Sequence, residues 1–105
     1  MGARRSAPVF AALGDQTRLT LMAKLSGGTR CSIARLTKGS ALSRQAITKH
    51  LRVLQNAGLV RGIHQGRERL FALEPKRLDE ARRALDDISR QWDQALARLK
   101  AFVDE

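Results

Sequence analysis

The chain has few cysteines and no long apolar run, and each shortage excludes a class of protein. It holds one cysteine, Cys31, among 105 residues, so no internal disulfide framework can form and a reducing compartment is expected. No apolar segment is long enough to span a bilayer, and the N-terminus lacks the apolar core of a signal peptide. We therefore expect a soluble, cytoplasmic protein with no membrane partner.

Acidic residues are almost absent from the first two-thirds of the chain. Residues 1–73 hold thirteen lysines and arginines against two acidic residues, Asp15 and Glu68, whereas residues 74–105 hold seven against eight. The net charge of +10 would be unusual for a metabolic enzyme and is expected for a protein that binds polyanions. The first two-thirds of the chain is therefore the part expected to bind a polyanion.

A basic amphipathic helix is predicted between Ser43 and Gly58. Three apolar residues, Ile47, Leu51 and Leu54, recur at helical spacing and can be buried. Ser43 can cap the first turn, and Gly58 suits the left-handed position that ends a helix. The opposite face carries side chains able to bond bases and phosphates, with no carboxylate among them: Arg44, Gln45, Thr48, Lys49 and Arg52. This face is typical of a DNA recognition helix, although a merely solvated surface can have the same composition.

The segments before this helix are expected to complete a helix-turn-helix. Residues 1–6 are predicted to be a disordered basic arm, and residues 7–75 the DNA-binding core. A short helix is expected over residues 8–13. A second helix would begin after an Asp15 cap and bury Leu19, Met22 and Leu25. A third is expected over residues 31–37, with Ile33, Ala34 and Leu36 inward. Lys38-Gly39-Ser40 would form the turn before the basic helix.

Residues 59–73 are predicted to form a β-hairpin, with strands over 59–64 and 67–73 around Gln65-Gly66. Arg67 and Arg69 lie near its tip. A basic hairpin after a helix-turn-helix is a wing that can reach the DNA backbone or minor groove. The hairpin could instead serve only to close the core.

A long helix is predicted over about residues 76–103, within a C-terminal segment of residues 76–105. Its apolar residues keep spacings of three and four: Leu78, Ala81, Leu85, Ile88, Trp92, Leu96, Leu99 and Phe102. A small core cannot cover so much apolar surface, so we expect the helix to pack against a second copy. The predicted homodimer interface comprises Val9, Phe10, Leu13, Leu85, Ile88, Trp92, Leu96 and Leu99.

Three segments of the chain resemble the ArsR/SmtB-type bacterial transcriptional repressors. They are residues 10–19 (FAALGDQTRL), residues 43–60 (SRQAITKHLRVLQNAGLV) and residues 66–75 (GRERLFALEP). The resemblance implies a dimeric winged-helix repressor that binds an imperfect inverted repeat near its own promoter, with dimer contacts from the first and last helices. Gln16 departs mildly from the pattern, since many members have proline there.

The chain lacks the metal-ligand motifs that metal-sensing members of that family carry. Metal-sensing members carry paired thiolates before the recognition helix, or histidine and carboxylate ligands on the last helix. This chain has one thiol, and its two histidines, His50 and His64, lie outside the last helix. We therefore expect no metal and no cofactor. Cys31 is interpreted as a buried apolar thiol, with a redox sensor as the alternative.

The fold class expected is mainly α with a small β-hairpin: a dimeric winged helix-turn-helix with a long C-terminal helix. The expected function is sequence-specific binding of double-stranded DNA as a homodimeric regulator, with an unidentified effector if one exists. Arg44, Gln45, Thr48 and Lys49 would probe bases, Arg52, Arg67 and Arg69 would hold phosphates, and Ser43 would cap the helix. The alternative is a non-specific or RNA-binding winged-helix module. An enzyme is not expected, because no nucleophile motif or phosphate-binding glycine loop is present.

Overall fold

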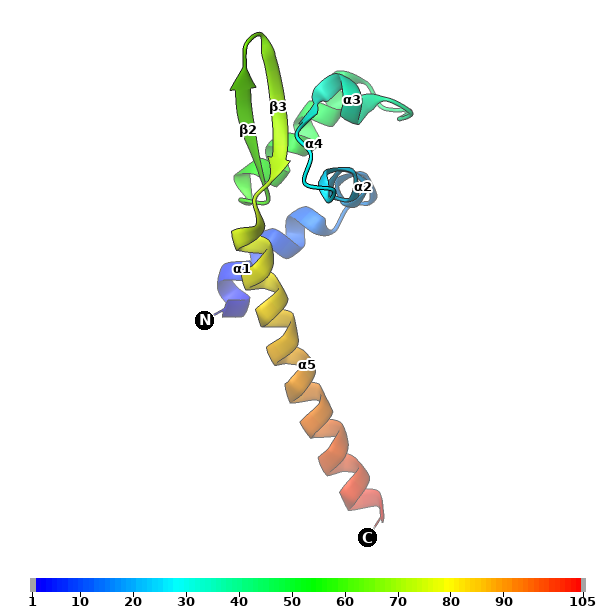
Figure 1. Ribbon diagram of the computed structural model, residues 1–105. Coiled ribbons are helices and arrows are strands. Elements are labelled where there is room, and N and C mark those ends of the chain that lie inside the picture. The colour runs from blue at the N-terminus through cyan, green and yellow to red at the C-terminus, as the bar shows by residue number, and fades with distance from the viewer. Residues whose placement is uncertain (1, 105) are drawn as a thin grey trace.

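The computed structural model describes residues 2–104 as five helices and a small sheet (Figure 1). Helices α1 and α2 come first, and α3 and α4 form the helix-turn-helix. Strands β2 and β3 form a hairpin, and α5 projects from the rest of the molecule (Figure 1). The bounds are α1 Gly2–Leu13, α2 Gln16–Leu25, β1 Cys31–Ser32, α3 Ile33–Thr37, α4 Arg44–Asn56, β2 Val60–Gln65, β3 Glu68–Leu73 and α5 Pro75–Asp104. The predicted fold class, mainly helical with a hairpin wing and a long last helix, is confirmed.

Capping side chains fix where the helices begin, as predicted for α2 and α4. The Asp15 carboxylate accepts a hydrogen bond from the backbone N–H of Arg18 at 3.0 Å, and the Ser43 hydroxyl accepts one from that of Ala46 at 3.1 Å. Ser32 caps α3 in the same way, through the N–H of Arg35 at 3.2 Å. Each bond satisfies a donor that the first turn of a helix leaves without a partner.

Helix α4 ends in a Schellman motif centred on Gly58. Gly58 has φ +79°, and its N–H bonds to the carbonyl of Gln55 while the N–H of Leu59 bonds to that of Leu54, both at 3.0 Å. Leu54 and Leu59 are both fully buried, which supplies the hydrophobic contact that accompanies this motif. The turn directs the chain from α4 straight into β2.

The sheet has a third strand that the sequence did not predict. Its order is β1-β3-β2, all antiparallel, with Cys31 opposite Phe71 and Ser32 opposite Leu70. Residues 31–32 were expected to be helical, so α3 is shorter than predicted. The hairpin turn also lies one residue later, because Gln65 pairs with Glu68 and leaves Gly66 and Arg67 as the loop. Gly66 has φ +62°, which suits the first position of a two-residue hairpin turn.

The core lies between the helices α1 to α4, the sheet and the first turns of α5. Ile47, Leu51 and Leu54 are buried, as the spacing on α4 predicted. Leu19 was wrongly expected to be inward: it is 47% exposed, and Leu21 takes its place beside Met22 and Leu25. Ala34 was also expected to face the core and is exposed.

Helix α1 corrects the expectation of a disordered N-terminal arm. Residues 2–6 are helical and not a disordered arm, and Ser6 is buried together with Val9 and Ala12. Residues 6, 9 and 12 follow helical spacing on one face, so burial of that face stabilises the helix. Arg5 lies 3.3 Å from a carboxylate oxygen of Glu80, which joins α1 to α5. Residue 1 of the expected arm lies outside the described residues.

Helix α5 is covered only over its first turns. Ala81 and Ala84 are its buried residues, and α1 packs beside this part of the helix. Beyond Ala84 the helix runs on without cover from the rest of the protomer (Figure 1). Among residues 2–104, no helix combines the length and apolar character needed to cross a membrane.

Candidate nucleic-acid interface

Helix α4 has one buried face and one basic, exposed face. Because Ile47, Leu51 and Leu54 anchor it to the core, the residues between them must face outward. Arg44, Gln45, Lys49 and Arg52 are all exposed, and Thr48 is half-buried. The predicted separation of apolar residues from basic and polar ones is therefore present in the structure.

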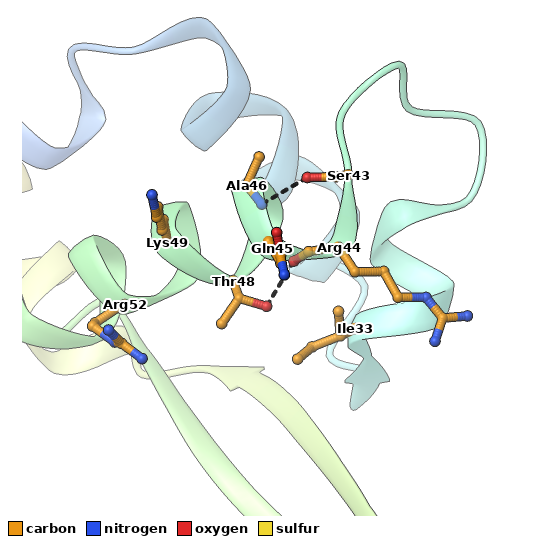
Figure 2. A pocket seen from close by; sticks show the side chains of 8 residues that line it. All are labelled: Ile33, Ser43, Arg44, Gln45, Ala46, Thr48, Lys49 and Arg52. Carbon is orange, nitrogen blue, oxygen red and sulfur yellow. Dashed lines mark hydrogen bonds between the residues drawn. The ribbon is translucent and has the colours of Figure 1, made fainter.

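Six of the eight predicted DNA-binding residues line a single hollow, which we call the α4 hollow. It has a volume of about 630 Å³ and is lined by Ile33, Ser43, Arg44, Gln45, Ala46, Thr48, Lys49 and Arg52. Arg44 and Lys49 are directed to opposite sides, with Thr48 between them (Figure 2). The lining therefore combines the charged side chains with the less polar Ile33, Ala46 and Thr48.

Ile33 is a lining residue that the sequence did not assign to this surface. It was predicted as an inward residue of its helix, and it does pack partly against the core. It is also the first residue of α3, and the helix-turn-helix places it beside Arg44 and Thr48 (Figure 2). Only its place at the start of a helix that crosses α4 could have indicated this second role.

The two predicted wing arginines lie outside the α4 hollow, on the hairpin. Arg67 is exposed in the two-residue turn at its tip. The Arg69 guanidinium instead lies 5.2 Å from the centre of the Phe71 ring, a cation–π contact. A Cβ atom on Gly62 would come within 3.4 Å of Arg69 Nε, so the glycine leaves room for the arginine to lie flat on the sheet.

His50 takes part in a contact between α4 and α2. Arg18 Nη1 lies 3.3 Å from Nδ1 of His50, and Asp15 Oδ2 lies 3.7 Å from the same nitrogen. Because a guanidinium can only donate, Nδ1 accepts when this bond is made. Arg18 also donates through Nε to the carbonyl of Ala12. Its side chain therefore joins the end of α1 and the start of α2 to α4.

Asp15 is the acidic group in this contact. The backbone N–H of Arg18 that donates to its carboxylate lowers the pKa of Asp15, and desolvation opposes the shift. The nearby charge of Arg18 also lowers it. The carboxylate is therefore ionised at neutral pH and stabilises the start of α2.

Neither the histidines nor Cys31 forms part of a metal cluster in the described chain. Among residues 2–104, no group of three or more histidine, cysteine, aspartate or glutamate side chains is placed to hold a metal ion. Cys31 is a buried free thiol in β1, with Sγ 3.7 Å from the carbonyl of Thr29. Its burial favours the apolar interpretation over the redox sensor.

A second surface runs along α5 beyond Ala84, and we call it the α5 stripe. Its residues are exposed at helical spacing: Leu85, Ile88, Trp92, Leu96, Leu99 and Phe102. Trp92 is 65% exposed and Leu96 56%, although such side chains are ordinarily buried. Phe10 and Leu13 on α1 are partly buried, whereas Val9 is only 2% exposed. Val9 therefore belongs to the core of the single chain and not to the predicted interface.

No family model matches the chain. Comparison with individual proteins finds relatives that are transcriptional regulators. The HTH-type transcriptional regulator Rv2034 of Mycobacterium tuberculosis is 33% identical over 93 residues, which are 89% of this chain and 83% of that protein. The structure of an ArsR-like transcriptional regulator from Rhodococcus sp. RHA1 gives a TM-score of 0.80 at 38% identity, covering 94% of this chain and 92% of that one.

A third comparison concerns the fold alone. The homodimeric winged helix-turn-helix DNA-binding domain Mb0332 of Mycobacterium bovis gives a TM-score of 0.64 at 18% identity, covering 90% of this chain and 84% of that one. The identity to the mycobacterial and rhodococcal regulators extends over nearly the whole chain, and this chain is folded as those solved structures are. The chain therefore belongs to the ArsR family of winged helix-turn-helix transcriptional regulators.

Proposed function

We propose that this regulator binds an inverted-repeat operator in double-stranded DNA as a homodimer and represses transcription. In this proposal the protein is cytoplasmic and has no catalytic activity of its own. The observation that carries the proposal is the exposed face of α4, where Arg44, Gln45, Lys49 and Arg52 surround one hollow. Residues 7–75 would form the DNA-binding core and residues 76–105 the dimerisation segment.

The residues of the α4 face divide into base-reading and phosphate-binding groups in this proposal. Arginine and lysine suit the acceptors of guanine, and glutamine suits adenine, so Arg44, Gln45 and Lys49 would read the major groove. Arg52 and the wing residues Arg67 and Arg69 would hold phosphates and set the position of the helix. Ser43 caps α4 while its own hydroxyl hydrogen stays free to donate to a phosphate at the helix N-terminus.

Binding of labelled duplexes, followed by fluorescence anisotropy, tests the DNA specificity. The target is DNA from the region upstream of the protein's own coding sequence, compared with shuffled DNA of equal length across a salt series. We expect a preference of about a thousandfold or more that persists at physiological salt. Equal binding to both duplexes, weakening together with salt, would instead indicate the non-specific module, and tighter binding of single-stranded or duplex RNA an RNA-binding module.

The α5 stripe supports the dimer. Burying an exposed leucine or isoleucine stabilises a protein by about 1.5–3 kcal/mol, and the stripe presents six large apolar side chains on one helix face. A second copy supplies an identical stripe, and most soluble oligomers are symmetric. Phe10 and Leu13, both partly exposed on α1, would extend this interface.

Substitution within the stripe tests the dimer separately from DNA binding. Leu96→Arg places a charge among apolar groups and is expected to shift the protein to the monomer mass in light scattering. Leu19→Arg is the matched control, because Leu19 is comparably exposed but lies on α2. An unchanged dimer mass for Leu96→Arg would remove α5 from the interface.

A further inference from the structure

The α4 hollow is lined by apolar side chains as well as basic ones. Thr48 lies one helical turn from both Arg44 and Arg52 on the same face of α4. Ile33 reaches the same hollow from α3, next to Thr48 (Figure 2). An isoleucine among arginines, a lysine and a glutamine contributes no hydrogen bond, so it contributes shape and apolar surface.

The hydroxyl of Thr48 is already used within the helix. Its Oγ1 donates to the backbone carbonyl of Arg44 at 2.7 Å. This bond fixes the side-chain rotamer, because the β-branched side chain has few alternatives in a helix. The Thr48 donor is thereby engaged. The oxygen can still accept a hydrogen bond, and the methyl group is the apolar part of the side chain that can contact a ligand in the hollow.

The major groove of DNA offers one apolar group to meet such a surface. Guanine, adenine and cytosine present only donors and acceptors there, whereas thymine also presents its C5-methyl group. A dry contact between methyl groups discriminates thymine without a hydrogen bond. Arg44 and Gln45, which border the same hollow, would then read the neighbouring base pairs.

We propose that the Thr48 methyl group and Ile33 together form a binding site for the 5-methyl group of a thymine in each half of the operator. The proposal rests on the proposed DNA-binding function and adds the base identity at one position. Ile33 becomes a specificity-determining residue contributed by α3, the helix that precedes the recognition helix.

Replacement of thymine by deoxyuridine tests the site, because it removes only that methyl group. A preferred duplex is first selected from random DNA by the wild-type protein, and each thymine is then replaced in turn. At one thymine per half-site the wild-type protein should lose affinity about fourfold for each methyl removed, the expected effect of one buried carbon. Thr48→Ser and Ile33→Ala should reduce that loss to near nothing at the same position.

The chain offers a matched control in Thr20. Its hydroxyl donates to the carbonyl of Gln16 at 3.0 Å, the same local bond as in Thr48, but it lies on α2 outside the α4 hollow. Thr20→Ser should leave the deoxyuridine effect unchanged. Circular dichroism checks that each variant is folded.

Three outcomes separate this proposal from the function on which it rests. Selection of a preferred sequence with no deoxyuridine effect, or with an effect that persists in both Thr48→Ser and Ile33→Ala, overturns the thymine site and leaves operator binding intact. Selection that recovers no sequence overturns the proposed function, and the thymine site with it. An effect lost only in these two variants supports both.

Discussion

Substitution of Gly58 provides a sharp test of the junction between the recognition helix and the wing. Its φ of +79° lies in the left-handed region, which costs roughly 1–2 kcal/mol for a residue with a Cβ atom. Alanine also restricts the unfolded chain, which offsets about 0.4–1 kcal/mol of that cost. Strain alone therefore predicts a net loss of about 0.5–1 kcal/mol in the free energy of unfolding.

A steric clash adds to this loss at Gly58 and at no other left-handed glycine described. A Cβ atom on residue 58 would lie 2.7 Å from Cγ of Arg77, whereas one on Gly66, with φ +62°, would meet nothing within 4 Å. Cγ is close to the backbone, so Arg77 must change rotamer, at about 0.5–1.5 kcal/mol. We expect Gly58→Ala to destabilise by about 2 kcal/mol and Gly66→Ala by about half as much.

Urea denaturation followed by circular dichroism at one fixed protein concentration measures both changes. In thermal unfolding the difference of about 1 kcal/mol corresponds to roughly 4–8 °C in Tm for a chain of this size. Arg77→Ala removes Cγ and with it the clash. Adding Gly58→Ala to the Arg77→Ala variant should therefore lower the free energy of unfolding only by the amount due to backbone strain. Equal losses for the two glycines, or no recovery in the double variant, would refute the clash.

Further expectations concern DNA binding and pH. Gln45→Ala should reduce the preference for the operator. Arg67→Ala should weaken binding to all duplexes alike and lower the salt slope by about two, one for each copy in the dimer. Uniform losses from both substitutions would contradict the division into base and phosphate contacts. Ser43→Asp keeps a capping oxygen, so Tm should hold while DNA affinity falls by charge repulsion, and a large drop in Tm would show that the cap geometry was lost. Because the pKa of Asp15 is lowered in the folded protein, its carboxylate contributes stability at neutral pH. That stability is lost as the pH falls below about 4 and through the folded-state pKa. Asp15→Asn should therefore flatten the acid side of a Tm–pH curve, and an unchanged curve would count against the shift.

The sequence predicted the elements that have strong local signals. Ser43 and Gly58 bound α4 because a capping hydroxyl and a left-handed glycine act through their own neighbours in the chain. Ile47 and Leu51 were recognisable as core residues because the opposite face of the helix is so polar. The same contrast located six of the residues that line the α4 hollow, but not Ile33 on α3.

The errors arose where a distant part of the chain decides the structure. Cys31 and Ser32 form a strand only because β3, nearly forty residues later, offers an edge for pairing, and two residues show no alternation. Leu19 and Leu21 are equally apolar, and the packing around α2 decides which is buried. The first residues look like an arm because the sequence there is basic. Ser6 is nevertheless buried, because α1 packs against α5, which lies about seventy residues later in the chain.

Ser32 belongs to two structural units at once. Its backbone pairs with Leu70 on the wing strand β3, and its side chain caps the helix that begins with Ile33. The wing is therefore fastened to the helix-turn-helix at a second point, besides the direct turn from α4 into β2. With two attachments, the hairpin is held in a fixed position relative to α4. Aligning the two elements on a ligand that contacts both would therefore cost little conformational entropy.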